Sequence, residues 1–223
     1  MLISPPFGGG RAPVLAKNTV ASSQPLATQA GIEALQSGGN AVDAALATAI
    51  TLTIVEPTMN GLGGDGFAIL WDGKQIHGLN ASGRAPAAWT PEYFDGKSAM
   101  DLIGWNTVTV PGMVSGWVEL SKKFGKLPFA QLFKRAIDYA ENGFPVSPVI
   151  ARQWREAIPI LKNQPGFAES FLIDGKAPQA GQIWRFPAQA NTLQEIAATQ
   201  GESFYKGALA KSMVDFEIGR AHV

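Results

Sequence analysis

The stretch that decides the fold is residues 37–67, SGGNAVDAALATAITLTIVEPTMNGLGGDGF. Its first glycines, Gly38 and Gly39, form a strong helix stop. The apolar residues before them recur at helical intervals, which predicts a first helix over 25–37. Residues 41–53 are nearly all small or apolar, and this is typical of a helix that is covered on most sides. We therefore expect the second helix in the interior of a layered fold.

A hairpin is predicted directly after these helices. The glycine-dense turn 60–66 leads into the continuous apolar run 67–71, which is typical of a buried strand. Asp72-Gly73 is a hairpin turn signal, and the return strand is predicted over 74–79.

Helical patterns return in the second half of the chain. Two amphipathic stretches, 114–124 and 128–141, each end near a glycine and predict paired helices. Residues 163–187 are rich in Gly, Pro and Gln, which predicts an irregular surface connection before a last helix over 188–199. Helices, a hairpin and further helices, with no repeat and no interdomain linker, predict the α+β fold class with an antiparallel sheet.

The glycine turn also matches G-x-G-x-x-G, the dinucleotide-binding fingerprint, at Gly61, Gly63 and Gly66. That fingerprint needs a strand before it and a helix after it, so that the helix N-terminus faces the pyrophosphate. Here the predicted order is helix, loop, strand. The motif therefore favours a turn whose glycines permit positive φ and close backbone approach, with anion binding by its N–H groups as an alternative.

Composition excludes several classes of function. The chain has no Cys, which excludes thiolate chemistry, and its only histidines are His77 and His222. A metal site would have to use carboxylates, and we expect no cofactor. Eighteen basic residues balance eighteen acidic ones without a basic block, so no nucleic-acid partner is expected.

No membrane association is expected either. The longest apolar stretch, 41–55, is shorter than the roughly 20 residues of a membrane span. Residues 1–10 lack the basic and apolar pattern of a secretory signal. We therefore expect a cytoplasmic location, with a periplasmic or secreted one as the alternative if the true N-terminus lies upstream.

Several motifs together resemble one enzyme family. The motifs are SGGNAVDAA at 37–45, Glu56-Pro57, GLGGDGF at 61–67, GRAP at 83–86, Val110-Pro111-Gly112 and FYKG at 204–207. In combination they resemble the large-subunit portion of γ-glutamyltransferases (γ-glutamyltranspeptidases or glutathione hydrolases) and cephalosporin-acylase-like enzymes. The similarity covers roughly residues 14 to 215.

This resemblance implies an N-terminal-nucleophile hydrolase fold, with two sheets between helices in a four-layer αββα arrangement. It also implies a precursor that cuts itself into a large and a small chain. The nucleophile is then the Thr exposed at the start of the small chain, whose own α-amino group acts as the base without a catalytic His. The implied partners are that small subunit and a γ-glutamyl or related small-molecule acyl substrate.

Family members are longer than this chain, so the resemblance implies a partial large-subunit domain over 1–217 that has no catalytic residue of its own. Residues 218–223 are expected to be a non-native tail, because one frame of a common sequencing adapter encodes IGRAHV. A natural frayed terminus is the alternative. Without its partner the chain should be inactive, and exposed apolar surfaces predict poor solubility.

Arg84 and Ser82 are the predicted substrate-binding residues. A carboxylate-bearing acyl group needs a cation, and a guanidinium pairs with a carboxylate in bidentate fashion. Aligned on Ala85-Pro86, the substrate arginine of γ-glutamyltransferases falls on Ser82, and Arg84 lies two residues later. Residues two apart in an extended strand face the same side, so Arg84 is expected to supply the charge from a displaced position. A surface arginine without function is the alternative.

The displaced arginine leaves the substrate open. The leading hypothesis is a γ-glutamyl amide hydrolase or transferase. The alternatives are a dicarboxylic-acyl amidohydrolase of the cephalosporin-acylase kind and a catalytically inactive carboxylate-binding module.

Other polar residues of the glycine loop are expected to be structural. Asp65 is able to accept hydrogen bonds from a substrate amine, but an Asp in a glycine turn usually bonds its own backbone, and that role is favoured. Glu56 and Asn60 are expected to pin the loop to the sheet. His77 is given a structural role near the hairpin, and the dispersed tryptophans are expected to pack in the core.

Overall fold

The computed structural model describes residues 15–87 and 89–221. Its α-helices are α1 (Pro25–Gln36), α2 (Ala41–Val55), α3 (Met113–Phe124), α4 (Lys134–Asn142), α5 (Pro148–Leu161), α6 (Phe167–Phe171), α7 (Pro187–Ala198), α8 (Glu202–Tyr205) and α9 (Ala208–Ala221). Short 3-10 helices are η1 (Pro91–Phe94), η2 (Trp105–Thr107) and η3 (Phe129–Phe133). The strands are β1 (Gly66–Trp71), β2 (Ile76–Ala81), β3 (Phe144–Pro145) and β4 (Ile183–Trp184). Strands β1 and β2 pair antiparallel, as do β3 and β4, so the predicted α+β class is confirmed.

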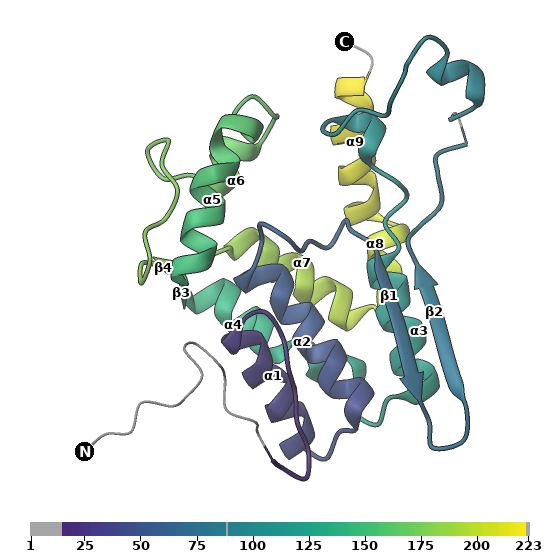
Figure 1. Cartoon of the computed structure of the whole chain (residues 1–223), viewed down its shortest axis with the longest axis vertical. Helices are drawn as coiled ribbons and strands as arrows, with labels where there is room; N and C mark the ends of the chain where they lie inside the picture. Colours follow the sequence, from purple (N-terminus) through teal and green to yellow (C-terminus); the bar gives the residue numbers. More distant parts are fainter. Residues whose placement is uncertain (1–14, 88, 222–223) are drawn as a thin grey trace, which may run out of the picture.

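We call helices α1 to α5 and α7 the helical body. Helix α2 lies at its centre, as the sequence predicted (Figure 1). It packs against α1, α3, η3 and α4, and its residues Ile50, Ile54 and Val55 are fully buried. Its buried threonines keep their hydrogen bonds, because the hydroxyls of Thr48 and Thr51 donate to carbonyl oxygens four residues earlier. A helix rich in Ala, Ile and Thr can therefore be covered on most sides.

A buried carboxylate holds the turn between α1 and α2. Gly38, at φ 90°, ends α1 as predicted, and the Asn40 side chain caps α2. The fully buried Asp43 accepts from the backbone N–H of Asn40 at 2.8 Å and completes a capping box. It also accepts from the backbone N–H groups of Lys126 and Leu127, at 3.0 and 3.2 Å. Asp43 therefore joins the α1–α2 turn to the turn that follows α3.

The β1–β2 hairpin lies along α3 at one side of the helical body (Figure 1). Its strands pair from Gly66 opposite Ala81 to Trp71 opposite Ile76. At the turn, the Asp72 carboxylate accepts from two backbone N–H groups, each at 2.8 Å. The hairpin predicted from Asp72-Gly73 is therefore confirmed.

One face of this hairpin is uncovered in the described part of the chain. The side chains of Phe67, Ile69, Trp71 and Ile76 are between 62% and 83% exposed. They alternate with half-buried residues that face α3. The prediction of a buried strand is wrong for this chain, because a continuous apolar run has two apolar faces and α3 covers one of them.

Helices α3 and α4 occupy the two ranges predicted to form a helix pair, with η3 replacing the start of the second. Both contact α2, but their other main partners differ: α3 packs on the hairpin and α4 packs on α7. The expected direct pairing is therefore replaced by separate packing of each helix on α2.

The segment 163–187 is more ordered than predicted. It contains α6 and β4, and its residues Phe171, Trp184 and Phe186 cluster around Trp154 of α5. The Trp154 indole Nε1 donates to the carbonyl oxygen of Phe171 at 2.8 Å. Aromatic packing therefore fixes a segment whose Gly and Pro content predicted an irregular connection.

The end of the chain also differs from the prediction. The helix expected over 188–199 forms α7, but it is not the last, because α8 and α9 follow it. Helix α9 includes residues 218–221 of the expected non-native tail, while residues 222–223 lie outside the described residues. Residues 1–10, on which the expected absence of a secretory signal rested, also lie outside them. In the described ranges no helix has the length and apolar character to cross a membrane.

Candidate functional site

Both residues predicted to bind substrate line one hollow at the end of the β1–β2 hairpin. The hollow has a volume of about 550 Å³ and lies between the segment that leaves β2 and the turn that precedes α3. Ser82 and Arg84 line it on one side, and Pro111, Ser115 and Tyr205 contribute to the other walls.

Two glycines allow the walls of this hollow to approach each other. Gly83 has φ +80°, and a Cβ atom there would lie 1.8 Å from the carbonyl oxygen of Val110. A Cβ atom on Gly112 would lie 2.2 Å from the carbonyl oxygen of Ala81. The carbonyl oxygen of Arg84 then accepts from the Val110 N–H at 2.9 Å. Neither glycine can be replaced without moving the segment that carries Arg84.

The conformation of Gly83 corrects one expectation. Strand β2 ends at Ala81, and the positive φ of Gly83 breaks the extended backbone that was predicted between Ser82 and Arg84. The argument that residues two apart face the same side therefore does not apply here. Ser82 and Arg84 line the same hollow through a bend in the chain.

Arg84 presents an uncommitted cation. Its side chain is exposed, and its guanidinium makes no ion pair or hydrogen bond with any residue of 15–87 or 89–221. The hydroxyl of the half-buried Ser82 is likewise unbonded within these ranges. A guanidinium and a hydroxyl both donate to carboxylates, so this side of the hollow is equipped to bind an anion.

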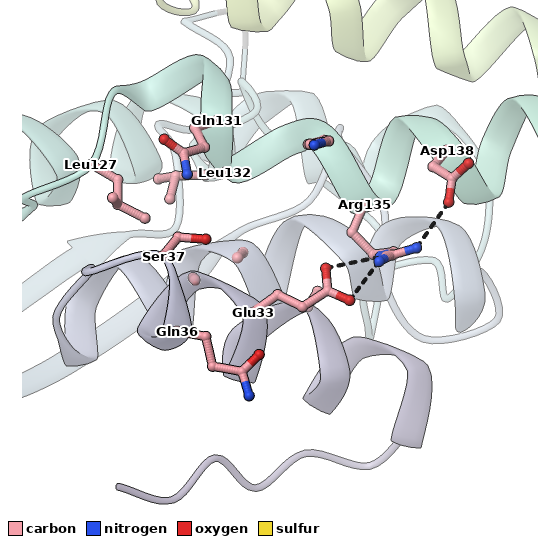
Figure 2. A pocket seen from close by; sticks show the side chains of 12 residues that line it. Glu33, Gln36, Ser37, Leu127, Gln131, Leu132, Arg135 and Asp138 are labelled. Atoms are coloured by element: carbon pink, nitrogen blue, oxygen red, sulfur yellow. Dashed lines mark hydrogen bonds and ion pairs between the residues drawn. The ribbon is translucent and has the colours of Figure 1, made fainter.

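A second hollow, between α1 and α4, also contains an arginine, but that arginine is committed. Arg135 donates to both carboxylate oxygens of Glu33, at 2.5 and 3.0 Å, and to Asp138 at 3.0 Å (Figure 2). The hydrogen bonds to Glu33 raise the pKa of Arg135. Arg135 of this hollow, which has a volume of about 500 Å³, therefore belongs to an ion-pair network that joins two helices, and unlike Arg84 it is not free to bind an anion.

The glycine loop 60–66 follows α2 and precedes β1, so the order that argued against a dinucleotide site is confirmed. The loop's glycines do not adopt the positive φ that was expected. Close approach does occur, because a Cβ atom on Gly66 would lie 2.9 Å from Met113 Sδ. The Met113 N–H donates to the carbonyl oxygen of Gly64 at 3.1 Å, which ties the loop to the start of α3.

The polar residues around this loop differ from their predicted roles. The exposed Asp65 carboxylate makes no hydrogen bond with a described residue, so the expected backbone-bonding role is wrong. The buried Glu56 accepts from the Ser23 hydroxyl at 2.5 Å and from Asn60 Nδ2 at 3.3 Å. Glu56 therefore pins the loop to the segment before α1 and not to the sheet.

The structural role predicted for His77 is confirmed. His77 Nε2 lies 2.7 Å from the Asp72 carboxylate, and its ring packs 4.8 Å from that of Phe124. Trp154 is buried in the core as expected, whereas Trp71 is 62% exposed on the uncovered hairpin face.

Sequence reasoning missed the contribution of Tyr205 to the hollow. Its hydroxyl donates to the carbonyl oxygen of Pro111 at 2.8 Å and accepts from the Ser115 N–H at 2.9 Å. Tyr205 is 90 positions from Ser115, so a local pattern could not place it here. The available signal was its place in the family-like motif FYKG.

The chain is similar to known proteins of one family. The Gamma-glutamyltranspeptidase family model matches residues 27–217. The glutathione hydrolase-like YwrD proenzyme of Bacillus subtilis is 40% identical over 201 residues, which are 89% of this chain and 38% of that protein. The oxamate amidohydrolase proenzyme of Klebsiella pneumoniae is 40% identical over 196 residues, 84% of this chain and 37% of that protein. The crystal structure of the cephalosporin acylase from Bacillus halodurans has a TM-score of 0.90 and 45% identity, over 98% of this chain and 42% of that chain.

These similarities confirm the predicted fold class and resemblance. The structural relatives are N-terminal-nucleophile hydrolases, and the match spans almost all of this chain. The chain spans less than two fifths of the length of the two curated relatives, and both are proenzymes. The chain belongs to the gamma-glutamyltranspeptidase family and corresponds to the N-terminal part of its members.

Proposed function

We propose that this chain is the N-terminal part of a self-processing amide hydrolase or acyltransferase whose acyl substrate carries a carboxylate. The observation that carries the proposal is the uncommitted Arg84 guanidinium, which lines the same hollow as the Ser82 hydroxyl. Arginine is suited to planar, bidentate binding of a carboxylate. A γ-glutamyl group carries such a carboxylate next to the amide-bearing side chain.

In this proposal the two halves of the protein have different tasks. Arg84 binds and orients the substrate carboxylate. The Thr at the start of a small subunit from the same precursor attacks the amide carbonyl, and its α-amino group takes the hydroxyl proton. His77 is not a candidate for that base, because it contacts Asp72 at the turn end of the hairpin, away from the hollow.

The uncovered hairpin face is an argument for a small subunit that packs on this chain. Phe67, Ile69 and Trp71 form an exposed apolar row along β1, which runs from the end of the hairpin that carries the hollow to the turn at Asp72. Exposed apolar patches of this kind mark interaction surfaces. We assign this face to the small subunit, which would place the nucleophile near Arg84.

A dicarboxylic-acyl amidohydrolase is the second candidate. The displaced position of Arg84, beyond the bend at Gly83, favours an acyl group whose shape differs from that of glutathione. The named activities of the relatives span this range, from glutathione hydrolase-like to oxamate amidohydrolase and cephalosporin acylase.

The test uses the complete proenzyme, obtained by extending the reading frame beyond Phe216 from source DNA. The purified protein is assayed with γ-glutamyl-p-nitroanilide and glutaryl-p-nitroanilide, which differ by the α-amino group. Arg84→Ala should raise KM for the accepted substrate about 10- to 100-fold, because a charge-assisted carboxylate contact contributes about 1.5–3 kcal/mol.

Arg152→Ala is the matched control, since Arg152 is an exposed arginine on α5. An unchanged KM in Arg84→Ala would refute the proposed role of Arg84. A frame that encodes no downstream Thr nucleophile would refute the enzyme and leave the inactive carboxylate-binding module.

A further inference from the structure

We propose that Tyr205 is a positioning residue for the Arg84 site. Its hydroxyl holds the turn 110–112, and that turn fixes the backbone of the segment 82–84. The kinetic consequence rests on the proposed function of Arg84, whereas the structural consequence does not.

The Tyr205 hydroxyl satisfies two backbone groups that have no other partner among residues 15–87 and 89–221. The Ser115 N–H belongs to the first turn of α3, where N–H groups have no intrahelical acceptor, and the helix has no side-chain cap at Gly112. The hydroxyl accepts from this N–H at 2.9 Å and donates to the Pro111 carbonyl oxygen at 2.8 Å. One phenol therefore caps α3 and fixes the turn before it.

The turn 110–112 fixes the segment that carries Arg84. The Val110 N–H donates to the Arg84 carbonyl oxygen at 2.9 Å, and the Thr109 hydroxyl donates to the Ser82 carbonyl oxygen at 3.2 Å. The two segments are in close contact, because a Cβ atom on Gly83 would lie 1.8 Å from the Val110 carbonyl oxygen. A shift of residues 110–112 must therefore move the backbone on which the guanidinium is mounted.

Tyr205 is itself held by the core. The preceding residue, Phe204, is buried, and its ring contacts that of Tyr205 edge-on at 5.2 Å. The Thr199 hydroxyl bonds the Ser203 N–H at 3.2 Å and the Ser203 hydroxyl at 2.9 Å, which fastens α8 to the end of α7. The Tyr205 side chain thus connects the helical core to the Arg84 site through the two hydrogen bonds of its hydroxyl.

Hydrogen exchange tests the structural step in the complete proenzyme. In Tyr205→Phe, the amides of Val110 and Ser115 should exchange about three- to tenfold faster, the range expected for one lost hydrogen bond. Tyr139→Phe is the matched control, because the Tyr139 hydroxyl contacts Gln29 at 3.5 Å, outside the hollow. Unchanged exchange at Val110 in Tyr205→Phe would overturn the proposal.

Steady-state kinetics test the consequence for the site. Tyr205→Phe should raise KM for a carboxylate-bearing acyl p-nitroanilide about three- to tenfold and change kcat less than about twofold. In an Arg84→Ala background the same substitution should have no further effect on kcat/KM, because its effect passes through Arg84. A lower melting temperature with unchanged KM, or additive effects of the two substitutions, would show that Tyr205 only stabilises the fold.

The two measurements also separate this inference from the proposed function. If the complete protein hydrolyses no acyl amide, the proposed function fails, while the exchange rate of Val110 still decides whether Tyr205 holds the turn. If Arg84→Ala raises KM but Tyr205→Phe changes neither KM nor exchange, the proposed function stands and the positioning role is refuted.

Discussion

The helical body and the β1–β2 hairpin both contain runs of apolar residues, yet among the described residues the helical body buries its runs while one face of the hairpin stays exposed. Trp154, Phe133 and Ile50 are each at most 1% exposed. On the outer face of the hairpin, Ile69 is 83% exposed and Trp71 is 62% exposed. The helical part therefore contains the partners for its own apolar surface, and the hairpin does not.

The two regions should contribute differently to the stability and to the solubility of the chain. Apolar burial stabilises by about 25 cal/mol per Å², so an uncovered apolar row represents stabilisation that is available only on association. The free energy of unfolding of this chain should therefore depend on the helical body, and its solubility should depend on the hairpin. Substitutions in the two regions can test this separation.

The largest expected effect comes from a matched pair of tryptophans. Trp154→Ala should destabilise the chain by about 3–5 kcal/mol, because it opens a cavity among the aromatic rings and removes the bond to Phe171. Trp71→Ala should change the free energy of unfolding by less than about 1 kcal/mol, because the side chain is 62% exposed. Urea unfolding at low protein concentration measures both, and equal losses would contradict the comparison.

A smaller effect is expected at the buried carboxylate of the helical body. Asp43→Ala should cost about 2–3 kcal/mol, because it removes a fully buried carboxylate and leaves the backbone N–H groups of Lys126 and Leu127 without their acceptor. Asp65→Ala is the control, since Asp65 is exposed and should change stability by less than about 0.5 kcal/mol. If Asp43→Ala proves as mild as the control, the joint between the α1–α2 turn and the turn after α3 is not a major contributor to stability.

The local signals of the sequence predicted much of this architecture. The glycine stop before Asn40, the apolar helix after it and the turn at Asp72-Gly73 each determine local backbone shape, and all formed as expected. The burial of β1 was predicted wrongly for a different reason. A continuous apolar run has two apolar faces, and the described residues cover one of them.

Helix α5 was missed for a local reason, whereas the missed features of the hollow depend on distant contacts. Helix α5 begins with a Ser147 cap and Pro148, but Pro159 inside it obscures the helical pattern. Arg84 and Ser82 were expected to meet through an extended strand, whereas the bend at Gly83 depends on close contact with Val110. Tyr205 reaches Pro111 across 94 positions, a separation that no local periodicity reports.

A charge on the exposed hairpin face tests whether this face causes association. Ile69→Lys should change the free energy of unfolding of this chain by less than about 1 kcal/mol, because its side chain is 83% exposed. The same charge should reduce self-association, which sedimentation velocity measures, and it should block assembly with the proposed small subunit. Val149→Lys on α5, where the side chain is 54% exposed, is the control. Equal self-association of Ile69→Lys and Val149→Lys would show that the hairpin face is not the surface through which the chain associates.

The smallest expected effect is a pH dependence confined to the hairpin turn. The pKa of Asp72 is lowered to about 2, first by the hydrogen bond from the Gln75 backbone N–H and then by His77 and the Lys74 N–H. Because the folded-state pKa lies below the usual value of 3.8, the carboxylate contributes its full stabilisation above about pH 4. That contribution falls as the pH drops through the window from about 4 to 2.

Asp72→Asn removes this titration while it keeps the size of the side chain. Hydrogen exchange of the β1–β2 amides should be faster in the variant than in the wild type at pH 5, and most of the difference should be lost as the pH falls to about 2. The helical body should show no such convergence, since in the described part of the chain the bonds of Asp72 all lie within the hairpin. A difference that persists unchanged to pH 2 would mean that the side-chain shape, and not the carboxylate charge, holds the turn.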